Sequence, residues 1–239
     1  MNMIWTIAKQ ELRSYFDSLM AYVLLVLFLG FSGIFTWIYG NDVFMNGQAS
    51  LQVFFSTAYV TLFLLIPALT MKSIAEEVRT GTIEMLLTKP ISCWQVVLGK
   101  YLAIMLLIAV SLALTAPYYF SVSLLGNIDH GAVICGYSGL LLMSSAYVGI
   151  GLFASSITNN QIVSFLLALL MGMFFHMFFG MVGHQFGGFF GQLAVGLDMN
   201  SHFDSIARGV IDTKDMVYFV SLTFVGTFLA EKSLESKIS

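Results

Sequence analysis

The sequence predicts an all-α integral membrane protein with six transmembrane helices. Of its 239 residues, 58% are hydrophobic and only 10% are charged, against about 25% charged residues in soluble domains. The mean hydropathy is +0.88. The charges are also spaced so that they leave apolar windows of about the 20 residues needed to cross the hydrocarbon core of a bilayer. These observations exclude an ordinary soluble globular protein.

The charge-free windows supply the predicted spans in order. They cover about residues 18–41, 52–71, 101–125, 132–153, 162–182 and 216–230. The fourth and fifth spans share one window without a charge, which the polar cluster at 155–161 divides. The expected organisation is an N-terminal helix over residues 1–17 followed by a six-helix transmembrane domain over residues 18–239.

Several local signals mark helix ends. Ser92 and Gln95 have the spacing of a capping box, and Thr158 and Gln161 repeat it before the fifth span. Negative charge favours the first turn of a helix, and two acids stand where the last span should begin, Asp212 and Asp215. Prolines inside the second and third spans predict kinks; they are Pro67 and Pro117.

Lysine and arginine determine the orientation, because the cytoplasmic loops of membrane proteins carry an excess of both. With the N-terminus inside, eight of the ten Lys and Arg residues fall in the cytoplasm, and only Arg208 and Lys214 fall outside. We therefore expect both termini in the cytoplasm. The cysteines then lie apart, Cys93 in a cytoplasmic loop and Cys135 in a bilayer helix, so no disulfide is expected.

The N-terminal segment has the pattern of an amphipathic helix. One stripe of a helix over residues 2–17 contains Ile4, Trp5, Ala8, Leu12 and Tyr15, and the basic residues lie off it. The pattern predicts a helix in the inner interface of the membrane, with Trp5 at the level of the lipid headgroups. The alternative, a frayed cytoplasmic tail, does not account for the stripe.

The polar segment 72–100 interrupts the apolar sequence between the second and third spans. An unpaired charge at the bilayer centre costs about 3 kcal/mol or more, so this segment is expected in water or in the interface. Gly81 ends the extension of the second helix, and one short turn then exposes four large apolar residues, Ile83, Met85, Leu86 and Leu87. Such a turn needs a partner to cover it. A re-entrant packing segment is the alternative, but it leaves the flanking charges unexplained.

The stretch EVRTGTIEMLLTKPIS at 77–92, followed by WQVVLGKY at 94–101, resembles the signature of ABC-2 type permeases. These are the membrane subunits of a class of ATP-binding-cassette exporters. The resemblance implies that the segment forms a cytoplasmic coupling helix docked in a groove of the ATPase subunit, and that residues 183–215 form short outer-leaflet helices before the last span. Residues 203–219 are similar to the small permeases associated with bacterial gliding motility, whose relatives include the permease beside nitrous oxide reductase.

By this resemblance the ATPase-docking residues are Glu76, Glu77, Arg79, Gly81, Thr82, Ile83, Glu84, Leu86, Leu87 and Pro90. A second, weaker cytoplasmic contact is implied at Ser156, Thr158, Asn159, Asn160 and Gln161. The sequence contains no G-x-x-x-x-G-K-[ST] phosphate-binding loop. The chain is therefore expected to be no enzyme, to have no catalytic residues and to bind no cofactor, since ATP and magnesium belong to the partner.

The resemblance also implies the partners and the location. The expected assembly contains a dimer of ABC ATPase subunits and a second permease chain, identical or related, in the bacterial inner membrane. Membrane lipid and a periplasmic or auxiliary membrane subunit are further candidate partners, and nucleic acid is not. The leading function is export or lateral release of an amphipathic, lipid-like substrate. The alternative is an assembly subunit that relays ATPase motion to a periplasmic partner without transport.

A lesser alternative is a copper-handling membrane protein. Thioether and imidazole ligands suit copper, and they gather in and after the fifth span at Met171, Met173, His176, Met177, Met181 and His184. Met171 lies off the stripe shared by Met173, His176 and Met177, and His184 lies beyond the span. Packing is therefore the preferred interpretation, and no metal site is expected.

The outer end of the chain gives two further expectations. Close helix approach and a turn back into the outer leaflet are expected at six glycines, namely Gly172, Gly180, Gly183, Gly187, Gly188 and Gly191. Arg208 is expected to form structural ion pairs with the outer acids, which are Asp204, Asp212 and Asp215.

Overall fold

The computed structural model describes residues 3–38, 50–82, 91–185, 188–210 and 212–237, and over these ranges the chain is helical and has no strand. Six helical segments are long and apolar enough to cross a membrane: Leu19–Trp37, Gln52–Thr80, Cys93–Leu125, His130–Ser156, Gln161–Gly183 and Thr213–Ser236. The fold class predicted from the sequence is therefore confirmed.

The described helices follow one another in this order: α1 (Met3–Asp17), α2 (Leu19–Trp37), α4 (Gln52–Thr70), α5 (Ala75–Thr80), α7 (Cys93–Ala113), α8 (Ala116–Leu125), α9 (His130–Ser156), α10 (Gln161–Met173), the π-helix η1 (Phe174–Phe178), α11 (Phe179–Gln185), α12 (Gly188–Val195), α13 (Met199–Ala207) and α14 (Thr213–Ser236).

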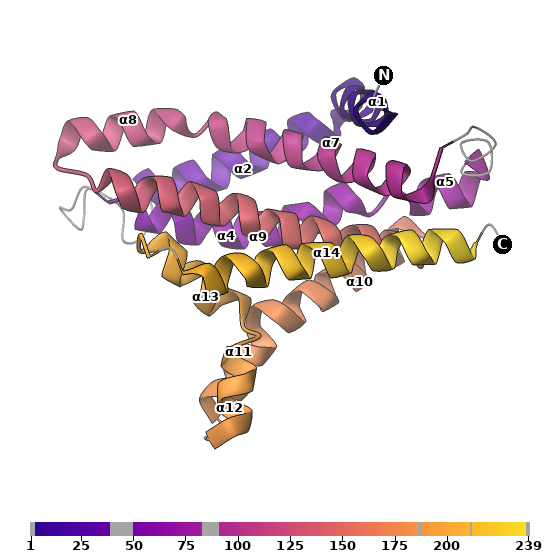
Figure 1. The fold of residues 1–239 in the computed structure, drawn as a ribbon. Coiled ribbons are helices and arrows are strands. Elements are labelled where there is room, and N and C mark those ends of the chain that lie inside the picture. The colour runs from indigo at the N-terminus through magenta and orange to yellow at the C-terminus, as the bar shows by residue number, and fades with distance from the viewer. Residues whose placement is uncertain (1–2, 39–49, 83–90, 186–187, 211, 238–239) are drawn as a thin grey trace.

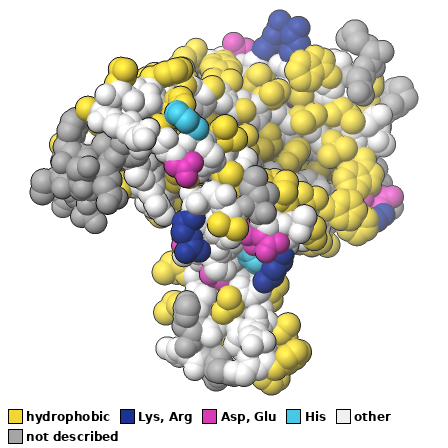
Figure 2. Space-filling model, turned by 60° about the vertical axis from the view of Figure 1, so that its left-hand side comes forward, with side chains coloured by type: hydrophobic (Ala, Val, Ile, Leu, Met, Phe, Trp, Pro, Cys, Tyr) yellow, Lys and Arg dark blue, Asp and Glu magenta, His cyan; other side chains and the backbone are white. Residues whose placement is uncertain are grey.

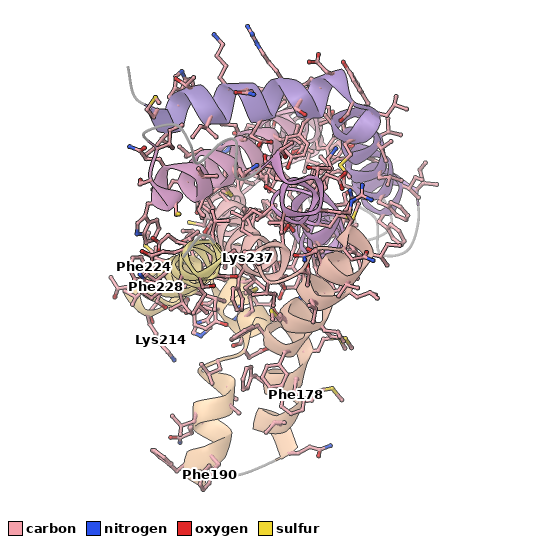
Figure 3. All side chains as sticks on the ribbon, turned by 90° about the vertical axis from the view of Figure 1, so that its right-hand side faces the viewer. Phe178, Phe190, Lys214, Phe224, Phe228 and Lys237 are labelled. Carbon is pink, nitrogen blue, oxygen red and sulfur yellow. The ribbon has the colours of Figure 1, made fainter. Side chains whose placement is uncertain are left out.

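Most of the long helices run along a common axis, and α10 runs obliquely to it (Figure 1). Helix α1 lies across the bundle on one flank, while the α11–α12 hairpin projects from the opposite flank (Figure 1; Figure 3). The short helix α5 lies at the same end of the bundle as the C-terminal end of α14 (Figure 1).

Helix α9 is the centre of the bundle, and it contacts α4, α7, α10, α13 and α14. Small residues bring its neighbours close. A Cβ atom added to Gly226 on α14 would lie only 2.5 Å from the carbonyl carbon of Gly149 on α9, and one added to Gly151 would lie 2.2 Å from the Oγ1 atom of Thr70 on α4. α14 therefore meets the backbone of α9 at Gly149, and the Thr70 side chain of α4 packs directly on Gly151.

Two predicted span boundaries are wrong in the same way. The third span begins at Cys93, not at Tyr101, because the predicted capping box forms: Gln95 N donates to Ser92 Oγ (3.3 Å) and Ser92 N donates to Gln95 Oε1 (3.2 Å). The helix then includes Lys100, whose charge had been used to end the window. Likewise α14 continues beyond residue 230 through the buried Glu231.

The capping box predicted at Thr158 and Gln161 is also wrong. Asn160 is the N-cap of α10, and its side chain accepts a hydrogen bond from Ile162 N (2.9 Å), while Thr158 Oγ1 donates backward to Ala154 O (3.2 Å). Asp212, one of the two acids at the predicted start of the last span, is the N-cap of α14, with Lys214 N donating to its carboxylate at 3.0 Å.

The two prolines have different consequences. Pro67 stays inside α4, whereas Pro117 lies in the first turn of α8, just after the break that separates α8 from α7. Thr115 stands at that break, and its hydroxyl lies 2.9 Å from the hydroxyl of Tyr137 on α9. The third span is thus a broken helix with its break tied to the centre of the bundle.

Helix α1 forms over the predicted residues, but its apolar stripe meets protein. Ile7, Ala8 and Tyr15 are buried, whereas Trp5 is 57% exposed. Helix α1 packs mainly on α7. A Cβ atom at Gly99 of α7 would lie 2.6 Å from Ile7 Cγ2. The absence of a side chain at Gly99 therefore allows α1 to sit tightly on the third span.

Candidate functional site

The segment that leaves the second span ends in a short, well-defined helix. α5 has six residues and is closed by Gly81, whose φ of 70° is the left-handed conformation that ends many helices. Thr80 Oγ1 donates to Glu76 O (2.8 Å) and shares a hydrogen bond with Thr82 Oγ1 (2.9 Å). Five of the predicted docking residues lie outside the described residues: Ile83, Glu84, Leu86, Leu87 and Pro90. The structure therefore describes the base of the predicted docking segment.

Glu76 joins the two predicted cytoplasmic contacts. Its carboxylate accepts hydrogen bonds from Gln161 Nε2, at the start of α10, and from Arg79 Nη2 (2.6 Å). The sequence placed Glu76 and Gln161 in separate contact regions, 85 residues apart. In the structure they form one polar surface.

Ser155 fixes the beginning of α5 to the end of α9. Its hydroxyl oxygen accepts from Ile74 N and Ala75 N, both at 3.0 Å, and its proton is directed to Met71 O at 3.2 Å. The side chain of Ile74, at the N-cap of α5, has no acceptor to offer. A serine from another helix therefore supplies the cap. The sequence placed Ser155 at the start of the polar cluster 155–161, but nothing in that cluster indicates which hydroxyl faces α5.

The second predicted contact is only partly accessible. Ser156 is completely buried, and its hydroxyl donates to Phe153 O within α9 (2.8 Å). Asn159 and Asn160 are exposed, and Asn159 Oδ1 accepts from Lys237 Nζ (3.1 Å) at the C-terminal end of α14 (Figure 3). Ser156 thus belongs to the packing of α9, and the asparagines form the surface.

Glu77 differs most from its predicted role. Its Oε1 atom lies 2.6 Å from Nζ of Lys100, which also contacts Glu11 Oε1 of α1 at 2.5 Å. The Lys100 side chain is only 2% exposed, and the side chains of Glu77 and Glu11 are 26% and 22% exposed. The Glu77 carboxylate therefore faces α7 and α1. The sequence did not predict the pairing of Lys100 with Glu11. The one available signal was the position of Lys100, a single lysine within an apolar stretch.

Further contacts hold α1 against the same region. Tyr15 Oη donates to Leu69 O near the end of α4 (3.2 Å), and Lys72 Nζ lies 5.7 Å from the centre of the Tyr15 ring. Burial raises the pKa of Tyr15, and the nearby Glu11 carboxylate adds to this effect. The phenol consequently keeps its proton and stays a hydrogen-bond donor.

The comparison with known families agrees with this arrangement. A family model described as ABC-2 family transporter protein matches residues 5–212. The chain belongs to this family. No curated protein matches the sequence.

Family membership settles the general role of the chain. It is a multi-pass membrane permease subunit of an ABC transporter, and its family works with an ABC ATPase subunit. The finer likeness to gliding-motility permeases stays a prediction. α5 forms the C-terminal end of the second candidate span, Gln52–Thr80, and the third candidate span begins at Cys93.

His176, a member of the predicted methionine and histidine cluster of the fifth span, contacts aromatic side chains. His176 Nδ1 lies 2.8 Å from the hydroxyl of Tyr147, and its ring stacks between Tyr59 and Phe63 with centroids 4.6 Å from each. Met173 and Met177 are about half exposed. Among the described residues no group of three His, Cys, Asp or Glu side chains is placed to hold a metal ion. These contacts account for His176 by packing and one hydrogen bond.

A second histidine, His202, was missed by the sequence analysis. It is buried on α13, with Nδ1 2.5 Å from Asp215 Oδ1 of α14 and Nε2 3.1 Å from Gly196 O. Asp215 was predicted to pair with Arg208, and this prediction is wrong. Arg208 Nε instead donates to Asp204 O (3.1 Å), and within the described ranges Arg208 forms no ion pair. The His202–Asp215 pair joins α13 to the last span of this permease.

Proposed function

We propose that this chain is the membrane subunit of an ABC-2 exporter in the bacterial inner membrane. It couples ATP hydrolysis by separate ATPase subunits to export, or lateral release, of an amphipathic, lipid-like substrate. The observation that carries the proposal is the attachment of α5. The base of the predicted docking segment is tied to α9 by Ser155 and to α10 by the Glu76–Gln161 hydrogen bond, so force applied at residues 83–90 reaches the membrane helices directly.

Two apolar grooves support the proposed substrate class. One of about 660 Å³ lies between α2 and α4, beside Phe31 and Val60, and one of about 500 Å³ lies beside the break between α7 and α8, facing Ile134 of α9. Both volumes are in the range of ordinary ligand sites, about 300–1,000 Å³. Because both grooves lie along membrane-spanning segments, they suit the hydrocarbon part of an amphiphile and not a polar solute.

The proposed mechanism needs two permease chains, one on each ATPase. ATP closes the ATPase dimer, which displaces the segment 83–90 of each permease. α5 moves with it, and the spans rotate against one another so that an amphiphile can leave sideways or outward. ATP and magnesium stay in the ATPase subunits, and this chain binds neither.

The orientation can be tested with single cysteines. Cys93 and Cys135 are first replaced by serine, and a cysteine is then placed at Asn127 or at Thr82, both of which are exposed. In intact cells an impermeant thiol reagent should label the cysteine at 127 and not the one at 82. Labelling at 82 but not at 127 would reverse the proposed orientation.

The docking role is tested by co-purification with the ATPase subunit. Glu84→Lys reverses a charge, and Leu86→Asp places one in the predicted apolar contact, where an unpaired buried charge costs about 3–5 kcal/mol. Both variants should insert normally but lose the ATPase. Glu235→Lys is the matched control, because Glu235 is exposed and pairs only with the exposed Lys232. Normal retention of the ATPase by both docking variants would contradict the proposal.

A second candidate function is an assembly subunit that relays ATPase motion to an outer partner. It is favoured by the projecting α11–α12 hairpin, where Phe189 and Phe190 are more than 70% exposed (Figure 2; Figure 3). ATPase activity stimulated by an added amphiphile supports transport. A tightly bound periplasmic protein, without such stimulation, supports the relay.

A further inference from the structure

Two adjacent carboxylates of α5 bind opposite sides of the bundle. Glu76 accepts from Gln161 at the start of α10, and the neighbouring Glu77 contacts Lys100 of α7. The first carboxylate acts beside the Ser155 cap, so it belongs to the attachment of α5 to α9 and α10. Among the described ion pairs, only that of Glu77 with Lys100 connects α5 with α7. Because Lys100 also pairs with Glu11, the same group connects α5 with α1.

Lys100 is the central member of this group. An ammonium that is 2% exposed has lost most of its water, and it is stable there only because charged partners replace that water. Lys100 has two such charged partners, Glu11 and Glu77, which lie 89 and 23 positions away from it in the sequence. This differs from an exposed salt bridge, which contributes little. Without Lys100 the carboxylates of α1 and α5 would face each other unpaired.

Helices α1 and α7 form one packed unit. The close approach of Ile7 to Gly99, one residue before Lys100, fixes α1 along the third span. Tyr15 adds a hydrogen bond to Leu69 O. A displacement of α5 that pulls on Lys100 therefore moves α1 and α7 together, not one side chain alone.

We propose that Lys100 is a positioning residue that links the ATPase-docking segment to α1 and the third span. The proposal rests on the function proposed above and extends it. Motion of α5 is transmitted along two routes. Glu76 and the Ser155 cap connect α5 with α10 and α9, and Glu77 connects it through Lys100 with α7 and α1. The N-terminal helix is accordingly a moving part of the permease as well as an interfacial anchor.

The test uses the full permease–ATPase complex with spin labels at Gln10, which is exposed on α1, and at Asn127, at the outer end. The background carries Cys93→Ser and Cys135→Ser. ATP should shift the Gln10–Asn127 distance in the otherwise unaltered chain. Lys100→Met replaces the lysine by a side chain of similar length without the charge. This variant should bind the ATPase in full stoichiometry but lose the ATP-dependent change in the Gln10–Asn127 distance. Lys100→Arg, which keeps the charge, should show that change.

Lys9→Met is the matched control, because Lys9 is an exposed lysine of α1, and it should preserve the shift. If Lys100→Met fails to fold, Glu11→Gln removes only the charge on α1 and should likewise lose the shift. An unaltered chain without any ATP-dependent shift overturns the proposal, and so does a full shift in a Lys100→Met or Glu11→Gln complex. Failure of the unaltered chain to bind the ATPase would instead refute the proposed function.

Discussion

The close crossing of α9 and α14 predicts a large effect from a single methyl group. In Gly226→Ala the new Cβ atom would lie 2.5 Å from the carbonyl carbon of Gly149, 2.8 Å from its oxygen and 2.9 Å from Ile150 N. These atoms belong to the backbone of α9, so no side chain can rotate away. The two helices must separate.

The size of the effect follows from the distances. Non-bonded carbon atoms prefer separations of about 3.5–4.0 Å, so α14 must move away from α9 by about 1 Å at this point. A gap of that size forfeits about a quarter to a half of the dispersion attraction of each contact. Overpacking a core destabilises the folded state by about 1–3 kcal/mol. For a chain of this length, such a loss of stability lowers the unfolding midpoint by roughly 2–12 °C.

The assay is thermal unfolding of the purified protein, followed by tryptophan fluorescence. Trp94 of α7 reports on this interface, since its ring lies 6.5 Å from Phe224 and 6.3 Å from Phe228 of α14 (Figure 3). Gly30→Ala is the control, because nothing lies within 4 Å of its Cβ position, and it should unfold like the unaltered protein. The reasoning is refuted if Gly226→Ala unfolds at the same temperature as Gly30→Ala.

Three further substitutions have defined expectations. His202→Ala leaves the Asp215 carboxylate buried without its partner and should destabilise the fold by about 3–5 kcal/mol; an unchanged unfolding midpoint would contradict this. His176→Gln can keep the hydrogen bond to Tyr147 but loses ring stacking, worth about 0.5–1.5 kcal/mol per pair. Assembly and activity should therefore stay near normal, and copper that co-purifies with the unaltered protein but vanishes in this variant would show that the packing interpretation is wrong. Ser155→Ala leaves two buried backbone N–H groups unpaired at about 1–3 kcal/mol each. It should accelerate amide hydrogen exchange over residues 74–80, whereas unchanged protection there would show that Ser155 does not hold α5.

The six spans were predictable because composition alone decides them. A run of about 20 apolar residues has few alternatives to crossing the bilayer as a helix, where every backbone group is satisfied internally. Local caps were predictable where the partner is three residues away, as at Ser92, and less so where several polar residues compete. At 158–161 the predicted cap was Thr158, whereas the N-cap of the helix is Asn160.

The pairings across helices were not predictable in this way. Lys100 pairs with Glu11 over 89 positions, and no periodicity in either segment refers to the other. The apolar stripe of α1 likewise does not predict what it contacts, because apolar residues have the same spacing in a helix that packs on lipid and in one that packs on protein. Tertiary contacts distinguish the two, such as that of Ile7 with Gly99 and that of Glu11 with Lys100.

Charged residues near the ends of the spans account for the boundary errors. A charge ends an apolar window only if it stays in water, and Lys100 does not, since two carboxylates replace its hydration. Asp215 is likewise buried against His202. Lys100 joins α7 to α5 and α1, and Asp215 joins α14 to α13. In the mechanism proposed above, these connections carry motion between the helices that they join. A purely apolar contact resists separation but permits sliding, whereas a buried, hydrogen-bonded pair holds one register between the elements that it joins.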